Sequence, residues 1–167
     1  MVTVILNIAG WFFLHMLIAF GATVLPRRLF HEDQWLYRIR SWEQNGALYK
    51  RLFNVTKWKG WLPDGAAWFR GGFAKKKVNA TDPEYLDLFV KETCRGEFTH
   101  WIVIALSPLF FLWNRRIAGV IMIVYAFAAN LPCILVQRYN RPQLLRILER
   151  KRQRGNLSTV ESRREFE

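Results

Sequence analysis

Long, uninterrupted runs of apolar residues constrain this chain more than any other feature of its sequence. One run covers residues 2–26, and two more follow at residues 98–113 and 117–136. A helix needs about 20 apolar residues to cross the hydrocarbon core of a bilayer, and the first and third runs meet that length. A soluble domain would instead spread its apolar residues periodically along the chain. The runs therefore predict an all-α integral membrane protein.

Composition supports this class of protein and excludes others. Of 167 residues, 51% are hydrophobic and 16% aromatic, yet 25 Lys and Arg against 13 Asp and Glu give a net charge of +12. Because the apolar residues form blocks, the charge indicates a membrane protein with a basic aqueous part, and no nucleic-acid partner is expected. Cys94 and Cys133 lie in unlike surroundings. We expect both to be reduced, and no metal is expected, since no paired Cys or His spacing suits one.

We expect about three transmembrane helices, namely an N-terminal anchor and a C-terminal helical hairpin. Residues 2–26 lack a basic start and a small-residue cleavage site, which favours a retained anchor over a removed signal peptide. His15 lies inside this anchor, where a neutral histidine bonded to another helix is the expected state. The hairpin turns at residues 114–116. Its first arm, residues 98–113, is short and contains Pro108, so it either crosses the membrane fully or re-enters.

The distribution of Lys and Arg predicts the orientation of these segments. Fourteen lie between the first and second apolar runs and nine follow the third, against two in the hairpin turn. By the positive-inside rule, residues 27–97 and the C-terminal region are cytoplasmic and the N terminus is outside. The chain is thus predicted to be a multi-pass protein of the cell membrane, in contact with membrane lipids, whose active site lies at the cytoplasmic leaflet.

The cytoplasmic layer is expected to contain amphipathic helices at the membrane surface. Between residues 30 and 44, apolar residues recur at helical spacing among arginines, which predicts a helix that closes at Gly46. Tryptophan beside arginine favours a position at the level of the lipid headgroups. A helix packed on a soluble core is the alternative.

A tryptophan-rich and lysine-rich segment follows in the same layer. Lys57, Trp58 and Lys59 begin it, and a predicted loop then turns at Asp64. Such a segment forms either an interface anchor or a site for an anionic headgroup or a phosphate.

The C-terminal part is predicted to leave the membrane at residues 137–142. A basic amphipathic helix covers residues 142–154 and ends at Gly155, and the polar residues 156–167 look disordered. The chain up to residue 155 then forms one membrane-embedded domain, whose basic interfacial region covers residues 27–97.

Glu97 and His100 are the most chemically suggestive pair in the sequence. A helix is predicted to start at Pro83 and to run towards Arg95, and Gly96 leaves open whether one bent helix or two helices carry the pair. Residues three apart project from one helix face, so the carboxylate and the imidazole can contact each other or a shared substrate at the mouth of the membrane segment. The alternative is an ion pair or polar clasp that joins the interfacial layer to the hairpin.

A set of short motifs is spread along the chain in a fixed order. They are Trp42-Glu43 with Gly46, Lys57-Trp58-Lys59, Asp64-Gly65, Glu92-Thr93 with Arg95, Glu97, His100-Trp101, Ala129-Asn130 with Pro132, and Gln137-Arg138-Tyr139-Asn140-Arg141-Pro142 followed by Leu144. From about Pro26 to Gly155 this order resembles that of the glycosyl-4,4'-diaponeurosporenoate acyltransferases. That family completes staphyloxanthin-type carotenoids by esterifying the sugar of a glycosylated carotenoid acid with a fatty acyl chain. Residues 69–77 and the polar tail show little likeness, which leaves the acceptor open between this glycolipid and a related one.

The resemblance implies a membrane acyltransferase. Transfer of an acyl group to a sugar hydroxyl needs a general base within hydrogen-bond reach and donors for the developing oxyanion. We expect His100 to be the general base and Glu97 to orient its imidazole, as the carboxylate of a triad does. No bound cofactor is expected, and an acyl thioester, carried by coenzyme A or by a carrier protein, is the co-substrate.

Further residues are expected to bind the substrate or the acyl donor. They are Arg95, Lys57, Trp58, Lys59, Asp64, Trp101, Arg138, Asn140 and Arg141. Arg138, Asn140 and Arg141 suit oxyanion or phosphate groups. Lys57 and Lys59 suit the phosphates of the donor.

Direct transfer is favoured over an acyl-enzyme, since no Gly-x-Ser-x-Gly elbow occurs. Cys94 lies six residues before His100, too far round a helix to be its obvious partner. A non-enzymatic membrane scaffold or anionic-lipid-binding protein is the alternative from another class. It explains the charge and the tryptophans equally well, but not the polar residues that gather around His100 and Asn140 at one membrane face. A small transporter is disfavoured, because three helices enclose little.

Overall fold

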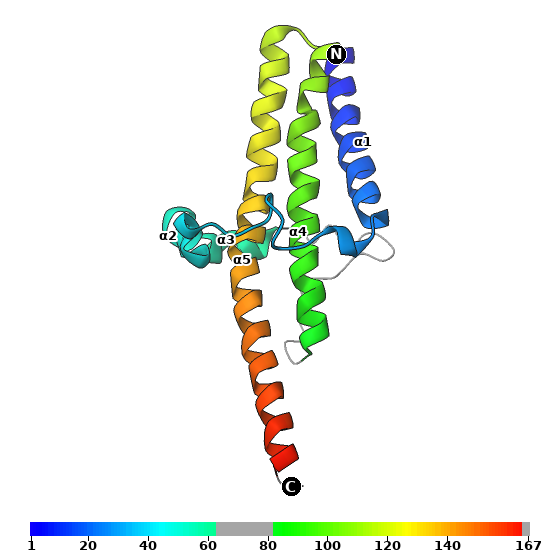
Figure 1. The fold of residues 1–167 in the computed structure, drawn as a ribbon. Helices are drawn as coiled ribbons and strands as arrows, with labels where there is room; N and C mark the ends of the chain where they lie inside the picture. Colours follow the sequence, from blue (N-terminus) through cyan, green and yellow to red (C-terminus); the bar gives the residue numbers. More distant parts are fainter. Residues whose placement is uncertain (63–81, 165–167) are drawn as a thin grey trace.

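A computed structural model describes residues 1–62 and 82–164 of this chain, with side chains up to Gly155. Within these residues every regular element is a helix and none is a strand. Three long helices form the frame, namely α1 (Val2–Val24), α4 (Pro83–Leu106) and α5 (Arg116–Arg164). They lie side by side in the upper part of Figure 1, and α5 alone extends past α4 towards the C terminus.

Two of these helices, α1 and α5, are long and apolar enough to cross a membrane. Their most apolar windows of 18 residues have mean hydropathies of 2.0 and 2.2, and only 6% of the α1 window is buried in the protein. An apolar helix with so little protein cover is stable in lipid rather than in water. The structure thus confirms the helical class and fits a membrane protein. Among the described residues no other helix meets the same criterion, so the third crossing stays a prediction.

One helix, α4, carries both Glu97 and His100. Its start agrees with the sequence-based prediction, because the side chain of Asp82 accepts a hydrogen bond of 2.9 Å from the backbone N–H of Glu84. Gly96 does not interrupt the helix. The two polar residues therefore have fixed positions on one helix face.

The hairpin between α4 and α5 closes through a 3₁₀ helix, η5 (Ser107–Leu112). Pro108 lies in its first turn and has no N–H for an α-helical hydrogen bond, so the α pattern ends there. The turn is tied to α1 by Asn7, whose amide exchanges hydrogen bonds of 3.0 and 2.7 Å with the amide of Asn114. The indole of Trp113 also donates to Asn7 at 2.8 Å. These contacts hold the start of α1 against the hairpin.

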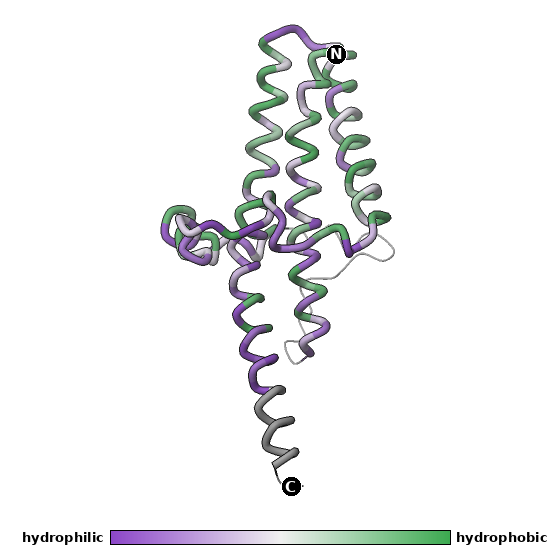
Figure 2. The backbone as a smooth tube through the Cα atoms, viewed as in Figure 1, coloured by the Kyte–Doolittle hydropathy of each residue, from purple (hydrophilic) through white to green (hydrophobic). Residues whose placement is uncertain are grey.

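Two apolar cores hold the long helices together. In the half near the N terminus, α1, α4, η5 and α5 contribute Trp11, Ile18, Val103, Ile104, Phe110, Ala126 and Ile134. In the other half, α4 and α5 meet through Leu86, Phe89, Val90, Leu144 and Leu148. Figure 2 shows the corresponding change in character, with hydrophobic residues prominent along the upper helices and hydrophilic residues along the lower part of α5.

The predicted start of a separate helix at Pro142 is wrong, because α5 runs through residues 137–142 as one helix. Pro142 removes one backbone hydrogen bond from the helix, at a cost of about 3 kcal/mol in a helix interior. Burial of Leu144 and Leu148 against α4 offsets this cost. The membrane segment and the basic helix that follows it are therefore one rigid element.

The predicted helix end at Gly155 is also wrong, since α5 continues to Arg164. A glycine in a helix costs only about 1 kcal/mol relative to alanine, which does not stop a helix by itself. The backbone of residues 156–164 is helical, in contrast to the expected disorder. Residues 165–167 lie outside the described part of the chain.

A compact platform of short helices lies beside the middle of α5 (Figure 1). It follows η1 (Arg27–Leu29), which comes directly after α1. We define the platform as residues 41–61, which form η2 (Ser41–Gly46), α2 (Ala47–Phe53), α3 (Val55–Trp58) and η3 (Lys59–Trp61). The loop predicted from Lys57 is therefore helical at its start, and its turn at Asp64 lies outside the described residues.

The predicted amphipathic helix at residues 30–44 is wrong. Residues 30–40 of this segment are irregular backbone with turns between residues 32 and 37, and η2 begins only at its end. The four consecutive carbonyl groups of residues 35–38 accept hydrogen bonds from the side chains of Arg40, Arg138 and Arg141. These bonds take the place of the backbone bonds that a helix would make, so tertiary contacts override the helical pattern.

Gly46 is the last residue of η2 and the N-cap of α2, so a helix does close at Gly46 as predicted, although it is the short η2 and not a helix over residues 30–44. Its φ of 88° is in the left-handed region, and Gln44 and Asn45 before it also have positive φ. A Cβ atom at Gly46 would lie 3.1 Å from the carbonyl oxygen of Tyr139 and 3.2 Å from Cγ of Pro142. A glycine here thus permits both the turn and the close approach of the platform to α5.

Candidate functional site

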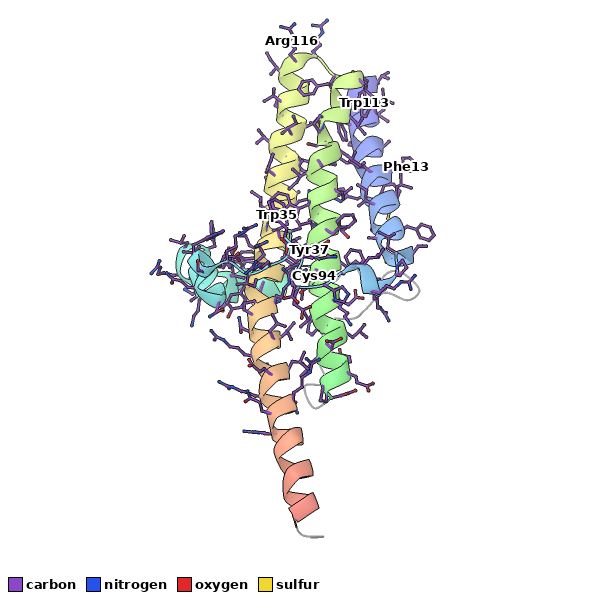
Figure 3. All side chains as sticks on the ribbon, in the orientation of Figure 1. Phe13, Trp35, Tyr37, Cys94, Trp113 and Arg116 are labelled. Atoms are coloured by element: carbon purple, nitrogen blue, oxygen red, sulfur yellow. The ribbon has the colours of Figure 1, made fainter. Side chains whose placement is uncertain are left out.

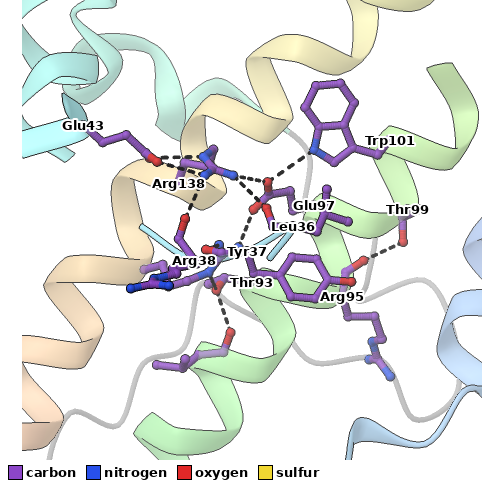
Figure 4. A network of polar contacts seen from close by, with 12 residues as sticks. Leu36, Tyr37, Arg38, Glu43, Thr93, Arg95, Glu97, Thr99, Trp101 and Arg138 are labelled. Atoms are coloured by element: carbon purple, nitrogen blue, oxygen red, sulfur yellow. Dashed lines mark hydrogen bonds and ion pairs between the residues drawn. The ribbon is translucent and has the colours of Figure 1, made fainter. Parts of the chain in front are cut away.

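A buried network of two glutamates and two arginines joins the platform, α4 and α5 (Figure 4). Glu43 comes from η2, Glu97 from α4, and Arg138 and Arg141 from α5. The side chains of Glu43, Glu97 and Arg141 have no exposed area, and that of Arg138 is 12% exposed. The formal charges of the four residues cancel, which is the condition for burying so many ions.

Arg138 is the hub of this network. Its guanidinium bonds the Glu43 carboxylate at 2.9 and 3.1 Å and the Glu97 carboxylate at 2.6 Å. It also donates to the carbonyl groups of Leu36 and Arg38. All five donors of the side chain are thus in use. Burial by itself lowers the pKa of Arg138, but Glu97 and Glu43 outweigh that effect and hold the pKa above its ordinary value.

Arg141 is enclosed just as completely. It donates at 2.9 Å to the hydroxyl of Thr93, at 2.6 Å to the carbonyl of Tyr37 and at 2.6 Å to Glu97. A substrate phosphate could reach this guanidinium only by breaking these bonds. The geometry therefore favours a structural role for Arg141 over the oxyanion role that the sequence suggested.

Glu97 uses both carboxylate oxygens inside the same network. One oxygen accepts from Arg138 and from the indole of Trp101, at 2.6 and 3.3 Å, and the other accepts from Arg141. The geometry of Glu97 thus favours the polar clasp that the sequence analysis kept as the alternative.

The phenol of Tyr49 completes the network from the platform side. It donates to Glu43 at 2.7 Å. Burial raises the pKa of Tyr49 above its ordinary value, and the hydrogen bond to Glu43 raises it further. The hydroxyl therefore stays neutral at physiological pH and acts as a donor.

His100 contacts a different residue of α5, Asn130. Its Nδ1 lies 2.8 Å from Oδ1 of Asn130, whose Nδ2 donates at 2.8 Å to the carbonyl of Ala126. A carbonyl can only accept, so the amide oxygen of Asn130 must face His100 and Nδ1 must carry a proton. In the neutral imidazole the lone pair is then on Nε2, which is the nitrogen that can act as a base.

An apolar groove of about 540 Å³ lies between the platform and α5. Its apolar walls include Trp42, Leu48, Leu52, Leu131, Ile134 and Leu135. Trp101 of α4 also lines it, and Arg40, Tyr49 and Arg138 are its polar lining residues. This volume is within the range of small-molecule sites, and the lining suits an apolar ligand with one polar end. His100 and Asn130 are not among the lining residues, but Trp101 and Leu131, which follow them in the sequence, line the groove, so the pair is one residue away from it on each helix.

The predicted lysine and asparagine residues form a smaller contact at the edge of the platform. Lys59 donates to Asn140 at 3.1 Å and lies 4.8 Å from the ring centroid of Tyr139. Trp58 is half-buried and donates to the carbonyl of Phe53, which is a local structural bond. Lys57 is exposed. Asp64 lies outside the described residues.

Arg95 belongs to a separate ion pair on α4. It bonds Glu92 at 2.6 Å, and Glu92 also accepts from Arg27 at 3.2 Å. The nearby Cys94 is buried, and burial raises the pKa of its thiol to about 11. A neutral thiol is a poor nucleophile, which is consistent with the preference for direct transfer. Cys94 and Cys133 are both reduced, as expected.

Sequence reasoning missed three residues of the site, namely Glu43, Tyr49 and Asn130. Glu43 and Asn130 are within the motifs that carried the family resemblance, but no role followed from their spacing. Asn130 had a usable signal, because a polar residue inside an apolar run usually binds a partner on another helix. Tyr49 had none, since its partner depends on the turn at Gly46.

The fold and the site together define a small helical membrane protein with an apolar groove beside a histidine and asparagine pair. Comparison with known proteins identifies its family. A family model described as glycosyl-4,4'-diaponeurosporenoate acyltransferase matches residues 33–150. The chain therefore belongs to this family and is an acyltransferase, which confirms the resemblance.

Relatives from Staphylococcus aureus carry the same description. Those of strains bovine RF122 / ET3-1 and MRSA252 are 34% identical to this chain over 147 residues, and that of strain N315 is 33% identical. Each alignment covers 86% of this chain and 88% of the relative. No solved structure was found to match the chain.

Proposed function

We propose that this acyltransferase esterifies a sugar hydroxyl of a glycosylated carotenoid acid, or of a related glycolipid, with a fatty acyl group from an acyl thioester. The names of its relatives support the acceptor. The observation that carries the proposal is the apolar groove next to the His100 and Asn130 pair. A groove of this kind binds the apolar chain of a substrate and leaves its polar end near the imidazole.

The proposal assigns His100 the role of general base in a direct transfer. Nε2 accepts the proton of the sugar hydroxyl while the hydroxyl oxygen attacks the carbonyl carbon of the thioester. The tetrahedral intermediate then expels the thiolate, which takes the proton from the imidazolium. The sugar ester and a free thiol are the products. Asn130 takes the orienting role that the sequence analysis gave to Glu97, because it fixes the tautomer.

The ion network has a positioning role in this proposal. Arg138 links Glu43 of the platform to Glu97 of α4, so it holds two sides of the groove at a fixed distance. Trp101 bonds Glu97 and lines the groove. Arg40 also lines the groove and is exposed, which makes it the better candidate for the phosphate or carbonyl group of a donor.

We also propose a membrane arrangement with three crossings and the N terminus outside. The 23 residues of α1 span about 34 Å, which matches the hydrocarbon core. Figure 1 shows the platform close to the level at which α1 ends, so the platform would lie at the cytoplasmic headgroups. The groove would then open where a lipid-soluble acceptor in the membrane meets a donor from the cytoplasm.

The proposal is tested with purified protein in nanodiscs, a glycosylated apocarotenoid acid and a long-chain acyl thioester. The acylated glycolipid is detected by mass spectrometry. We expect product from the parent protein and from a His31→Ala control, since His31 is exposed and is not a lining residue of the groove. His100→Ala should give no product at an unchanged melting temperature. Product from His100→Ala would remove the base role, and no product from any variant with several glycolipids would overturn the acceptor assignment.

A further inference from the structure

The part of α5 below the platform carries a stripe of arginines that the proposed chemistry does not use. Arg146, Arg150 and Arg154 are four residues apart, so they share one face of the helix. All three are exposed, and none makes an ion pair within the described part of the chain. Figure 3 shows long side chains with nitrogen ends projecting from this part of α5, on the side where the platform lies.

This arginine stripe is not needed to pack the protein. The opposite face of the helix contains Leu144 and Leu148, which are buried against α4. The ionic contact with α4 comes from another residue, Arg152, which bonds Asp87 at 3.3 Å. Like charges four residues apart repel each other in a helix, so the stripe destabilises free α5 and would be stabilised by an acidic partner.

The direction of α5 favours a protein partner over a lipid surface. Arg154 is 16 residues beyond Arg138, or about 24 Å along the helix axis. The attraction of anionic headgroups falls off within a Debye length, about 8 Å at physiological ionic strength. Because α5 continues the line of the membrane helices (Figure 1), the outer part of the stripe lies beyond the range of the headgroups. The positive-inside rule explains the total charge, but it does not require the charges to share one face.

We propose that the arginine stripe docks an acidic carrier protein that delivers the acyl group as a thioester. This inference rests on the proposed function and identifies the class of its donor. The stripe begins eight residues after Arg138, a lining residue of the groove, so it lies about 12 Å below the groove on the same rigid helix. A carrier bound there presents its thioester arm towards the groove from the cytoplasmic side.

The test compares two donors with the same acyl group, myristoyl-coenzyme A and a myristoylated acidic acyl carrier protein. The variant is Arg146→Gln with Arg150→Gln and Arg154→Gln, and the matched control replaces the same three residues by Lys. We expect the Gln variant to raise the KM for the carrier protein about tenfold, because electrostatic steering is lost. The KM and kcat of the Gln variant for myristoyl-coenzyme A should not change. The Lys control should behave like the parent protein with both donors.

Three outcomes would overturn the inference, and each is distinct from failure of the proposed function. Equal KM values of the parent protein and the Gln variant for the myristoylated carrier protein would show that the stripe does not dock it. A parent protein that accepts myristoyl-coenzyme A but not the myristoylated carrier protein would show the same. An effect of the Gln variant that appears only in nanodiscs with anionic lipid would assign the stripe to the membrane surface. Failure of the parent protein with both donors would instead overturn the proposed function.

Discussion

Two polar groups join α4 to α5, one through Glu97 and the other through His100, which lies about one helical turn further along α4. They differ in charge and in burial. The ion network around Arg138 is charged, almost fully buried and closed, since every donor of its hub is bonded within the protein. The His100 and Asn130 pair is joined by a hydrogen bond of 2.8 Å between an imidazole and an amide, and His100 is only half-buried. A closed network has nothing left with which to bind a substrate. The comparison teaches that the group with the largest charges holds the framework, and we therefore assign the proposed chemistry to the half-buried pair.

The largest effect expected is on the closed network. Arg141→Leu removes one of the two arginines that neutralise Glu97, and breaking a buried ion pair in this way costs about 3–5 kcal/mol. We expect a large fall in the melting temperature measured in detergent, with loss of activity as a consequence. Arg115→Leu, at the exposed hairpin turn, should have no such effect. If the Arg141 variant kept its melting temperature and lost only activity, the ion network would not have the structural role that distinguishes it from the His100 and Asn130 pair.

The second effect concerns the His100 and Asn130 pair, and it should lower kcat without lowering stability. Asn130→Leu has a similar volume but leaves Nδ1 of His100 without its acceptor, so the ring loses its defined tautomer. We expect kcat to fall about 100-fold with little change in KM, measured by single-turnover and steady-state kinetics. Ala129→Leu, at the exposed neighbouring position, is the control. An unchanged kcat in the Asn130 variant would return the pair to a structural role.

A third, smaller effect tests the apolar groove between the platform and α5. Leu52 lines the groove and is 62% exposed, so Leu52→Trp should fill part of it without disturbing the core. We expect the KM for long-chain thioesters to rise about tenfold, with a shift of preference towards shorter chains. Leu17→Trp adds the same ring to an exposed position of α1. Equal effects of the two substitutions on chain-length preference would show that the groove does not hold the acyl chain.

The smallest effect concerns the contact that places the platform against α5. Gly46→Ala puts a Cβ atom 3.1 Å from the carbonyl oxygen of Tyr139 at a positive φ, for which we expect a loss of stability of about 1–2 kcal/mol. Gly60→Ala is the matched control in the same platform, because nothing lies within 4 Å of its added Cβ. Thermal unfolding of both variants checks the prediction. A Gly46 variant as stable as the Gly60 variant would mean that the platform does not depend on this close approach.

Local features of the chain predicted much of the frame. The apolar runs predicted α1 and the membrane part of α5, and the predicted helix start at Pro83 is the start of α4. Failures occurred where a local rule met a tertiary contact. Pro142 and Gly155 normally end helices, yet packing on α4 and continued helical propensity carry α5 through both. Residues 30–44 have a helical pattern, but the arginines of α5 bind their carbonyl groups.

The sequence predicted several residues of the candidate site, but it did not predict which of them contact each other. Spacing alone placed Glu97 and His100 on one helix face, which the structure confirms. Their partners lie 41 and 44 residues away from Glu97, at Arg138 and Arg141, and 30 residues away from His100, at Asn130. Such distances along the chain are closed only by the hairpin, so no local pattern could assign them.

Hydrophobicity and charge are sums over neighbouring residues, and for this protein they were enough to determine a helical membrane protein with a strongly basic part. The motifs were enough to determine its family. Which carboxylate neutralises which arginine, and which amide sets the tautomer of His100, were decided only when α4 and α5 packed together. A buried ion is stable only if its partners arrive from other elements, so the division between framework and chemistry is a property of the tertiary structure.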